Sequence, residues 1–273
     1  MLQLILQRVD EYLRERQASG LAGHEYLCQD HSKGRVEASS LLLFSAQERQ
    51  PLLVAKGTPL CNALVREDRL VNRIEFESLE RLQQIGMNRD RQTTPSPLGI
   101  WEVKGVLITL QSALPGSPLE TVPARKRFSR DQLANSVDQV IDWWKLLQAN
   151  FGVRRQKLDQ DSYRELVLQQ VEAFTKRFVI DPEEKRFLYH RFEEACGLLG
   201  AELPLLVRHG DFCPANMVVQ PSGIGVFDWE WPLRHHLPLF DLFHFFAALR
   251  YPSRTLRGRS SHYASFIEIF WGQ

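Results

Sequence analysis

The spacing of apolar residues changes once along this chain, between residues 111 and 116, and this change limits the folds that it can adopt. Before that point, short apolar runs are separated by tight polar connections, which is typical of an antiparallel sheet. After it, apolar residues recur at helical spacing. The order predicts an α+β fold in which a small sheet with one helix precedes a mainly helical part.

The first domain is expected at residues 20–112, after an amphipathic N-terminal helix at residues 1–19. It is predicted to have the element order βββαββ. The strands are expected at residues 24–29, 39–46, 51–58, 99–104 and 106–112, and the helix at residues 67–85.

The second domain, residues 113–273, is predicted to be mainly helical. Three helix starts are expected from capping residues: Ser129 with Gln132, Ser162 with Glu165, and Asp181 with Pro182 and Glu184. Residues 240–249 predict a further helix. Strands are expected on either side of the loop in residues 206–219, and at residues 223–229.

Composition excludes several classes of protein. The 34 basic and 33 acidic residues give a net charge of +1, which makes no case for binding nucleic acid or an anionic membrane. No apolar run approaches the about 18 residues that a membrane-spanning helix needs. The cysteines form no CxxC pair, which fits a reducing cytosol: Cys28, Cys61, Cys196 and Cys213. We therefore expect a cytoplasmic protein that binds neither nucleic acid nor membrane, and the sequence leaves its oligomeric state open.

A polar loop lies between two of the expected strands, in the sequence LVRHGDFCPANMVV at residues 206–219. It contains His209, Asp211 and Asn216, and Asp228 follows at the end of the next strand. If the two strands pair as a hairpin, Asp211, Asn216 and Asp228 converge at one end, where their oxygens suit a hard cation such as magnesium. Taken singly, His209 is more often a hydrogen-bonded core histidine, and Asp228 more often a turn residue.

A second candidate group is Lys56, which shares its strand face with Leu52 and Val54. Because a lysine is costly to bury without a partner, it is either an edge lysine with its amine in water or a lysine paired with a carboxylate. Glu75 lies near the inward face of the predicted helix and is the expected partner.

Three spaced motifs resemble the aminoglycoside phosphotransferase and choline kinase-like family, whose members are relatives of the protein kinases. They are HGDFCPAN, then GVFDWEW, then Pro238-Leu239-Phe240-Asp241-Leu242. The resemblance extends to Val54-Ala55-Lys56 and covers residues 20–250. It implies a bilobal protein-kinase-like fold and a cytoplasmic enzyme that uses ATP and Mg²⁺. Such an enzyme transfers the γ-phosphate to a hydroxyl of an aminoglycoside-, choline- or sugar-like small molecule.

The resemblance also implies roles for the loop residues. Asp211 would accept or orient the proton of the acceptor hydroxyl, and His209 would hold the loop in shape by hydrogen bonding. Asn216 and Asp228 would bind magnesium.

The nucleotide site implied by the resemblance lies mainly in the first domain. Lys56, positioned by Glu75, would contact the α- and β-phosphates. Ser32 and the turn around it would cover the phosphates. Adenine would contact the backbone groups of Gln111, Ser112 and Ala113.

The sequence departs from the family pattern in places. The turn at residues 30–35 has a single glycine, and Cys213 stands where many members have histidine. Only 43 residues follow Glu230, whereas members usually continue with helices that wall the substrate site, so we expect a truncated chain or an unusually open pocket. The end of the chain is rich in arginine: Arg250, Arg254, Arg257 and Arg259. These residues either form a solvated basic loop or favour a sugar, a phosphorylated metabolite or an anionic acceptor over a cationic one.

Two other classes of function stay open. The first is a non-catalytic kinase-like module that binds nucleotide or a partner protein, although such a module has no need of Asp211. The second is a metal-dependent hydrolase, which would need more histidine and carboxylate ligands than these loops supply.

Overall fold

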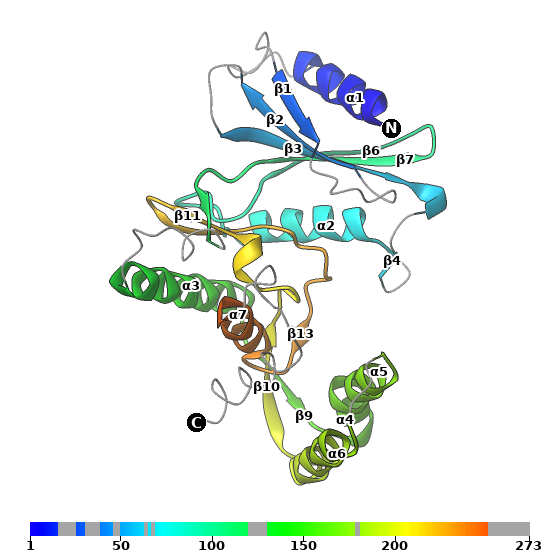
Figure 1. Cartoon of the computed structure of the whole chain (residues 1–273), viewed down its shortest axis with the longest axis vertical. Coiled ribbons are helices and arrows are strands. Elements are labelled where there is room, and N and C mark those ends of the chain that lie inside the picture. Colours follow the sequence, from blue (N-terminus) through cyan, green and yellow to red (C-terminus); the bar gives the residue numbers. More distant parts are fainter. Residues whose placement is uncertain are drawn as a thin grey trace. The chain divides into compact units, whose positions relative to one another are not determined.

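Figure 1 shows the fold as a computed structural model, which describes residues 1–15, 26–30, 39–45, 50–62, 65–66, 69–119, 130–177 and 181–250. The chain divides into two compact units. The first, here called the sheet unit, takes in the described residues of Met1–Asn150, His209–Leu233 and Asp241–Gln273. The second, the helical unit, consists of Phe151–Arg208 and Arg234–Phe240. Every predicted site residue that the structure describes lies in the sheet unit.

The sheet unit is built on a five-stranded antiparallel sheet with the strand order β1-β2-β3-β7-β6. Its strands are β1 (Tyr26–Asp30), β2 (Ser39–Ser45), β3 (Pro51–Pro59), β6 (Pro97–Val103) and β7 (Val106–Ser112). The tight turn from β6 to β7 uses Lys104 and Gly105, both at positive φ, as a type I′ hairpin turn requires. All five strands expected from the sequence are therefore present.

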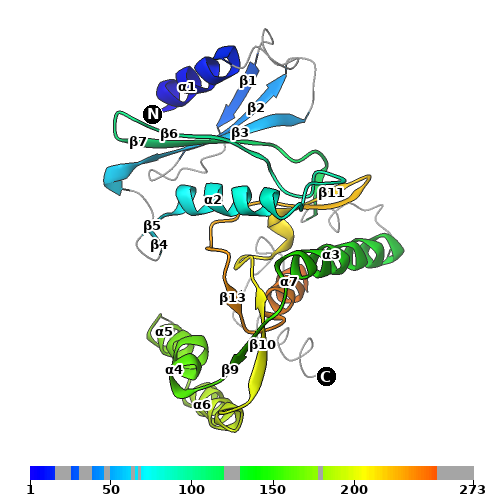
Figure 2. The same ribbon diagram turned by 180° about the vertical axis from the view of Figure 1, so that it is seen from behind.

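Two helices cover opposite faces of this sheet, as Figures 1 and 2 show from front and back. Helix α1 (Leu2–Glu15) places Ile5 in one hydrophobic core with Ala55 of β3. Helix α2 (Val71–Gln84) lies on the other face, where Lys56 of β3 contacts it. Because side chains alternate along a strand, neighbouring residues of β3 face different helices.

The sheet unit contains further short strands and helices beyond the five-stranded sheet. Strands β11 (Met217–Gln220) and β12 (Gly223–Val226) form the predicted antiparallel hairpin, with Met217 opposite Val226. The unit also contains η1 (Leu60–Asn62), β4 (Val65–Arg66), β5 (Arg69–Leu70), β8 (Ser117–Pro118), α3 (Arg130–Phe151), η4 (Pro214–Asn216) and α7 (Phe240–Arg250).

Buried aromatic rings pack behind the polar loop that precedes β11. Trp143 of α3 stacks on Phe212 with ring centroids 5.7 Å apart, and Phe212 contacts Phe245 of α7 at 5.9 Å. All three side chains are buried. Burying an aromatic or large aliphatic side chain stabilises a fold by about 1.5–3 kcal/mol, so these rings hold the loop against α3 and α7.

The helical unit combines a three-stranded sheet, in the order β13-β10-β9, with short helices. Its elements are β9 (Arg154–Lys157), α4 (Gln160–Tyr163), the π-helical turn η3 (Arg164–Leu168), α5 (Gln169–Arg177), α6 (Pro182–Cys196), β10 (Glu202–Val207) and β13 (His235–His236). Among the described residues of both units, none of the helices has the length and apolar character needed to cross a bilayer.

The helix starts test the capping predictions. Asp181 and Glu184 form the predicted capping box at the start of α6. The cap predicted at Ser162 is wrong, because Asp159 accepts the hydrogen bond from the Ser162 N–H and the helix begins at Gln160. Ser129 lies outside the described residues. The predicted α+β class is confirmed.

Candidate active site

The loop that precedes β11 is fixed by the first turn of α7. Asp241, only 2% exposed, accepts hydrogen bonds from the backbone N–H groups of His209 (2.7 Å) and Gly210 (3.1 Å). Gly210 has φ 88°, and a Cβ atom there would overlap the side chain of Trp231, so the turn requires glycine. The loop therefore has one defined conformation at the point where it presents Asp211.

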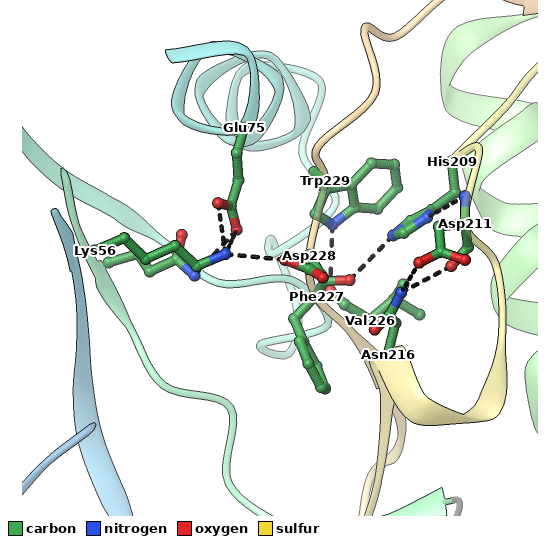
Figure 3. Close-up of polar contacts among 10 residues, drawn as sticks. Lys56, Glu75, His209, Asp211, Asn216, Val226, Phe227, Asp228 and Trp229 are labelled. Carbon is green, nitrogen blue, oxygen red and sulfur yellow. Dashed lines mark hydrogen bonds and ion pairs between the residues drawn. The ribbon is translucent and has the colours of Figure 1, made fainter. Parts of the chain in front are cut away.

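His209 links this loop to the turn after β12, as Figure 3 shows. Its ring is fully buried, its Nδ1 lies 3.3 Å from the Asp211 N–H, and its Nε2 lies 3.1 Å from the Phe227 carbonyl. Burial lowers the pKa of His209, with the charge of Asp241 opposing. A neutral ring that accepts at Nδ1 and donates at Nε2 satisfies both contacts. Its geometry is that of a group that holds two loops together.

Asn216 joins Asp211 directly. Its Nδ2 donates to the backbone oxygen and to Oδ2 of Asp211, both at 2.9 Å. The backbone oxygen of Asn216 accepts from the Phe227 N–H at 3.0 Å. Asp211, Asn216 and the turn containing Asp228 are thus brought together, as the hairpin argument predicted.

Asp228 adopts a backbone conformation that is uncommon for a residue other than glycine, with φ 70°. The next residue, Trp229, is fully buried, and its Nε1–H donates to the Val226 carbonyl at 3.2 Å. The indole also lies against the His209 ring, with centroids 4.3 Å apart. These contacts hold the turn in its strained form, a feature that recurs at functional sites.

Lys56 contacts two carboxylates at once (Figure 3). Its Nζ lies 2.9 Å and 2.7 Å from the two oxygens of Glu75 and 2.9 Å from Oδ1 of Asp228. The pairing with Glu75 expected from the sequence is therefore present. The contact with Asp228 connects the lysine-bearing strand to the turn after β12.

The charges in this cluster do not balance. Burial alone would lower the pKa of Lys56, but the charges of Asp228 and Glu75 outweigh it and raise that pKa. Burial raises the pKa of Glu75, while the ammonium of Lys56 opposes the shift. When ionised, the three groups Lys56, Glu75 and Asp228 have a combined formal charge of −1, a sign that attracts a cation.

The candidate adenine-contacting residues at the end of β7 are already engaged. Gln111 is buried, and its Nε2 donates to Oε1 of Glu75 at 3.4 Å. The N–H of Ser112 donates to the Ser96 carbonyl at 2.9 Å, and the N–H of Ala113 donates to the Leu52 carbonyl at 2.8 Å. The N–H groups of Ser112 and Ala113 can therefore donate to a nucleobase only if these two bonds are released. Ser32 lies outside the described residues.

Two contacts of the site were not anticipated from the sequence. The first is the Asp241 carboxylate that fixes the loop. In the sequence, Asp241 appears only as part of the motif at residues 238–242, which begins a helix. His244, one turn later on α7, places its Nε2 3.9 Å from Oδ1 of Asp211. The helical spacing of residues 241 and 244 was the available signal, because it puts both on the same side of α7.

The chain is similar to known proteins over most of its length. The profile of the phosphotransferase enzyme family (APH) matches residues 66–265. Aminoglycoside phosphotransferase APH(3'')-Id from Streptomyces rimosus ATCC10970 is 19% identical, over 96% of this chain and 90% of that one, with a TM-score of 0.50. The aminoglycoside-3'-phosphotransferase of type VIII is 19% identical, over 96% and 91%, with a TM-score of 0.53. No curated protein matches the sequence. Both of these structures have the same fold as this chain.

Proposed function

The chain belongs to the phosphotransferase enzyme family, and we propose that it is a kinase that transfers the γ-phosphate of ATP to a hydroxyl of a small molecule. The observation that carries this proposal is the continuous polar network from Lys56 through Asp228 to the loop of Asp211 and Asn216. Phosphoryl transfer depends on such positioning and charge stabilisation more than on covalent chemistry by the protein.

Asp211 is the candidate catalytic base. Its side chain is 48% exposed, and Asn216 holds only one of its two oxygens, Oδ2. In the proposed reaction Oδ1 accepts the proton of the acceptor hydroxyl as that oxygen attacks the γ-phosphorus. General-base assistance of this kind typically contributes roughly 10²–10⁴-fold in rate.

Asn216 and Asp228 are the candidate magnesium ligands. Nδ2 of Asn216 donates to Asp211, so Oδ1 of Asn216 is the atom that would bind a cation. Asp228 belongs to the negatively charged cluster with Lys56 and Glu75. Magnesium is commonly held by one or two protein oxygens together with phosphates and waters, so this donor set fits. The bound ion would supply charge stabilisation to the phosphate oxygens.

Lys56 is the candidate phosphate-binding residue. Glu75 holds its ammonium on the α2 side of the sheet, where it remains charged. In the proposed complex this ammonium faces the α- and β-phosphates, as it does in related kinases. We also propose that residues 20–112 serve mainly as the nucleotide-binding lobe and residues 113–273 as the lobe that carries the catalytic and metal-binding loops.

The acceptor is proposed only as a hydroxyl-bearing small molecule. The two structural neighbours are aminoglycoside phosphotransferases by name, but at 19% identity they support the fold of this chain and not its substrate. Location in the cytoplasm is proposed from the free thiols of Cys61, Cys196 and Cys213.

The test compares the wild-type protein with Asp211→Asn, using γ-labelled ATP, Mg²⁺ and a metabolite extract. We expect the wild type to transfer label to an organic acceptor and the variant to lose roughly 10²–10⁴-fold in rate. Nucleotide binding, measured by calorimetry, should persist in the variant because Lys56, Asn216 and Asp228 are intact. Binding of ATP without any transfer by the wild type would instead support the non-catalytic alternative.

A further inference from the structure

The two oxygens of the candidate base have different surroundings. Oδ2 of Asp211 accepts a hydrogen bond from Asn216 at 2.9 Å, whereas Oδ1 lies 3.9 Å from Nε2 of His244. The side chains of Asp211 and His244 are 48% and 38% exposed. The oxygen that would take the substrate proton is therefore the one that His244 approaches.

The separation of 3.9 Å is too long for a hydrogen bond between the two side chains. An oxygen atom to one side of the line between Asp211 Oδ1 and His244 Nε2 can lie at about 2.8 Å from both. An acceptor hydroxyl has the groups that such a position needs, because it donates one hydrogen bond and accepts others.

We propose that His244 binds the acceptor's hydroxyl oxygen beside Asp211, and that the acceptor is an uncharged hydroxyl compound such as a sugar or polyol. The inference rests on the kinase function proposed above and names the substrate class of that site. His244 acts as a positioning residue: its Nε2–H donates to one lone pair of the hydroxyl oxygen, and a second lone pair remains for attack.

The bond changes follow from this arrangement. The O–H bond of the acceptor breaks and its proton passes to Oδ1 of Asp211. A bond forms between the acceptor oxygen and the γ-phosphorus of ATP. The bond from that phosphorus to the β,γ-bridging oxygen breaks, and ADP leaves with the electron pair.

His244 is held in place by its neighbours on α7. Asp241, three residues before it, bonds to the backbone of His209 and Gly210. Phe245, the residue after it, is fully buried against Phe212. Because both anchors act on the loop that carries Asp211, the distance between His244 and Asp211 is set by packing and not by a flexible connection.

The chemistry of α7 favours an uncharged acceptor. Asp241 is the single acidic residue of this helix, and it is buried and bonded to the backbone. A polyamine or a quaternary ammonium acceptor would call for carboxylates or an aromatic cage around its cations. The helix instead contributes the His244 imidazole, which is 38% exposed, and an exposed aromatic residue, Phe243, at 49%. Hydrogen-bonding and aromatic side chains of this kind suit a molecule with hydroxyl groups and an apolar face.

The first experiment identifies the charge class of the acceptor. A metabolite extract is separated by ion exchange into cationic, uncharged and anionic fractions before each is incubated with the full chain, Mg²⁺ and γ-labelled ATP. We expect labelled product from the uncharged fraction. Product from only the cationic or only the anionic fraction overturns this inference and leaves the kinase proposal standing. Absence of organic product from every fraction overturns both.

The second experiment uses the active fraction with His244→Ala, His244→Gln and, as a matched control, His190→Ala on the exposed surface of α6. Loss of one neutral hydrogen bond should lower kcat/KM for the acceptor by roughly 2- to 12-fold in His244→Ala, with KM for ATP unchanged. His244→Gln, which keeps a donor, should recover part of the loss. Equal acceptor kinetics in wild type and His244→Ala, or a change confined to KM for ATP, contradicts the role proposed for His244.

Discussion

A single ammonium group, that of Lys56, is shared between Glu75 and Asp228. Glu75 also accepts a hydrogen bond from Gln111 at 3.4 Å. In the proposed complex Asp228 would bind the magnesium ion while the Lys56 ammonium faces the phosphates. The arrangement keeps the lysine charged and oriented before nucleotide arrives, which reduces the cost of organising the site on binding.

Cys213 provides a test of the charge that surrounds Asp211. Burial, followed by the negative charge of Asp211, raises the pKa of this thiol to about 11. Since the thiolate is the reactive form, its alkylation by iodoacetamide should rise roughly tenfold for each pH unit between pH 8 and pH 10. Mass spectrometry of the peptide containing Cys213 measures this rate. In Asp211→Asn the rate at pH 8 should increase, and a wild-type rate that levels off near pH 9 contradicts the prediction.

Residue positions in the site were partly predictable from the sequence. The approach of Asp211, Asn216 and Asp228 followed from a hairpin of known spacing, and the pairing of Lys56 with Glu75 followed from the cost of burying a charge. The side-chain contact of Gln111 and the backbone contacts of Ser112 and Ala113 could not be foreseen. They depend on which neighbours the folded sheet brings to the end of β7.

Helix α1 supports the strand that carries Lys56. Gly57 directly follows Lys56 in β3. The side chain of Ile5 is fully buried and occupies the place where a Cβ atom on Gly57 would lie. Glycine at position 57 therefore allows the helix to approach the sheet closely. The amphipathic N-terminal segment that the sequence predicted is thus part of the support for the candidate nucleotide site.

Truncating this contact should destabilise the protein. Ile5→Ala removes buried methyl groups and leaves a cavity, so we expect the free energy of unfolding to fall by about 2–5 kcal/mol. Leu2→Ala, on the same helix but 45% exposed, should change it by less than about 0.5 kcal/mol. Urea denaturation followed by circular dichroism distinguishes the two. Equal unfolding midpoints for both variants would show that α1 contributes little to the stability of the sheet.

The sequence predicted helices and strands correctly where local signals were strong. It failed where a strand exists only because it pairs with another strand. The alternating pattern of β3 and the capping box at Asp181 are local, and both appear as predicted. The two-residue strands β8 and β13 were not predicted, because so short a strand is defined by its partner and not by its own composition. The spacing of Ser162 and Glu165 predicts a cap at Ser162, but Asp159, three residues earlier, caps the helix instead.

At the scale of the whole molecule, the two units differ in how well their elements are buried. The central strands of the sheet unit contain fully buried residues, whereas α6 of the helical unit contains none that is buried. Phe187 and Tyr189 of α6 are exposed. The apolar side chains of this helix are therefore only partly covered in the structure.

This difference predicts unequal protection from hydrogen exchange. Amides of β3 and β7 should exchange slowest, whereas those of α6 should exchange much faster because local opening exposes little apolar surface. Exchange followed by mass spectrometry at the peptide level measures both in one sample. Similar protection of α6 and β7 would mean that the helical unit opens only together with the sheet unit.

Helix α7 both supports the loop of Asp211 and contributes exposed residues near it, and this affects how related proteins can change their substrates. Asp241 and Phe245 support the loop that carries the base, whereas Phe243 and His244 are partly exposed beside it. Selection can therefore replace the two partly exposed residues and explore new acceptors while the two buried residues keep the base in position. Adaptation to a different substrate then requires few coordinated changes, all within one turn of one helix.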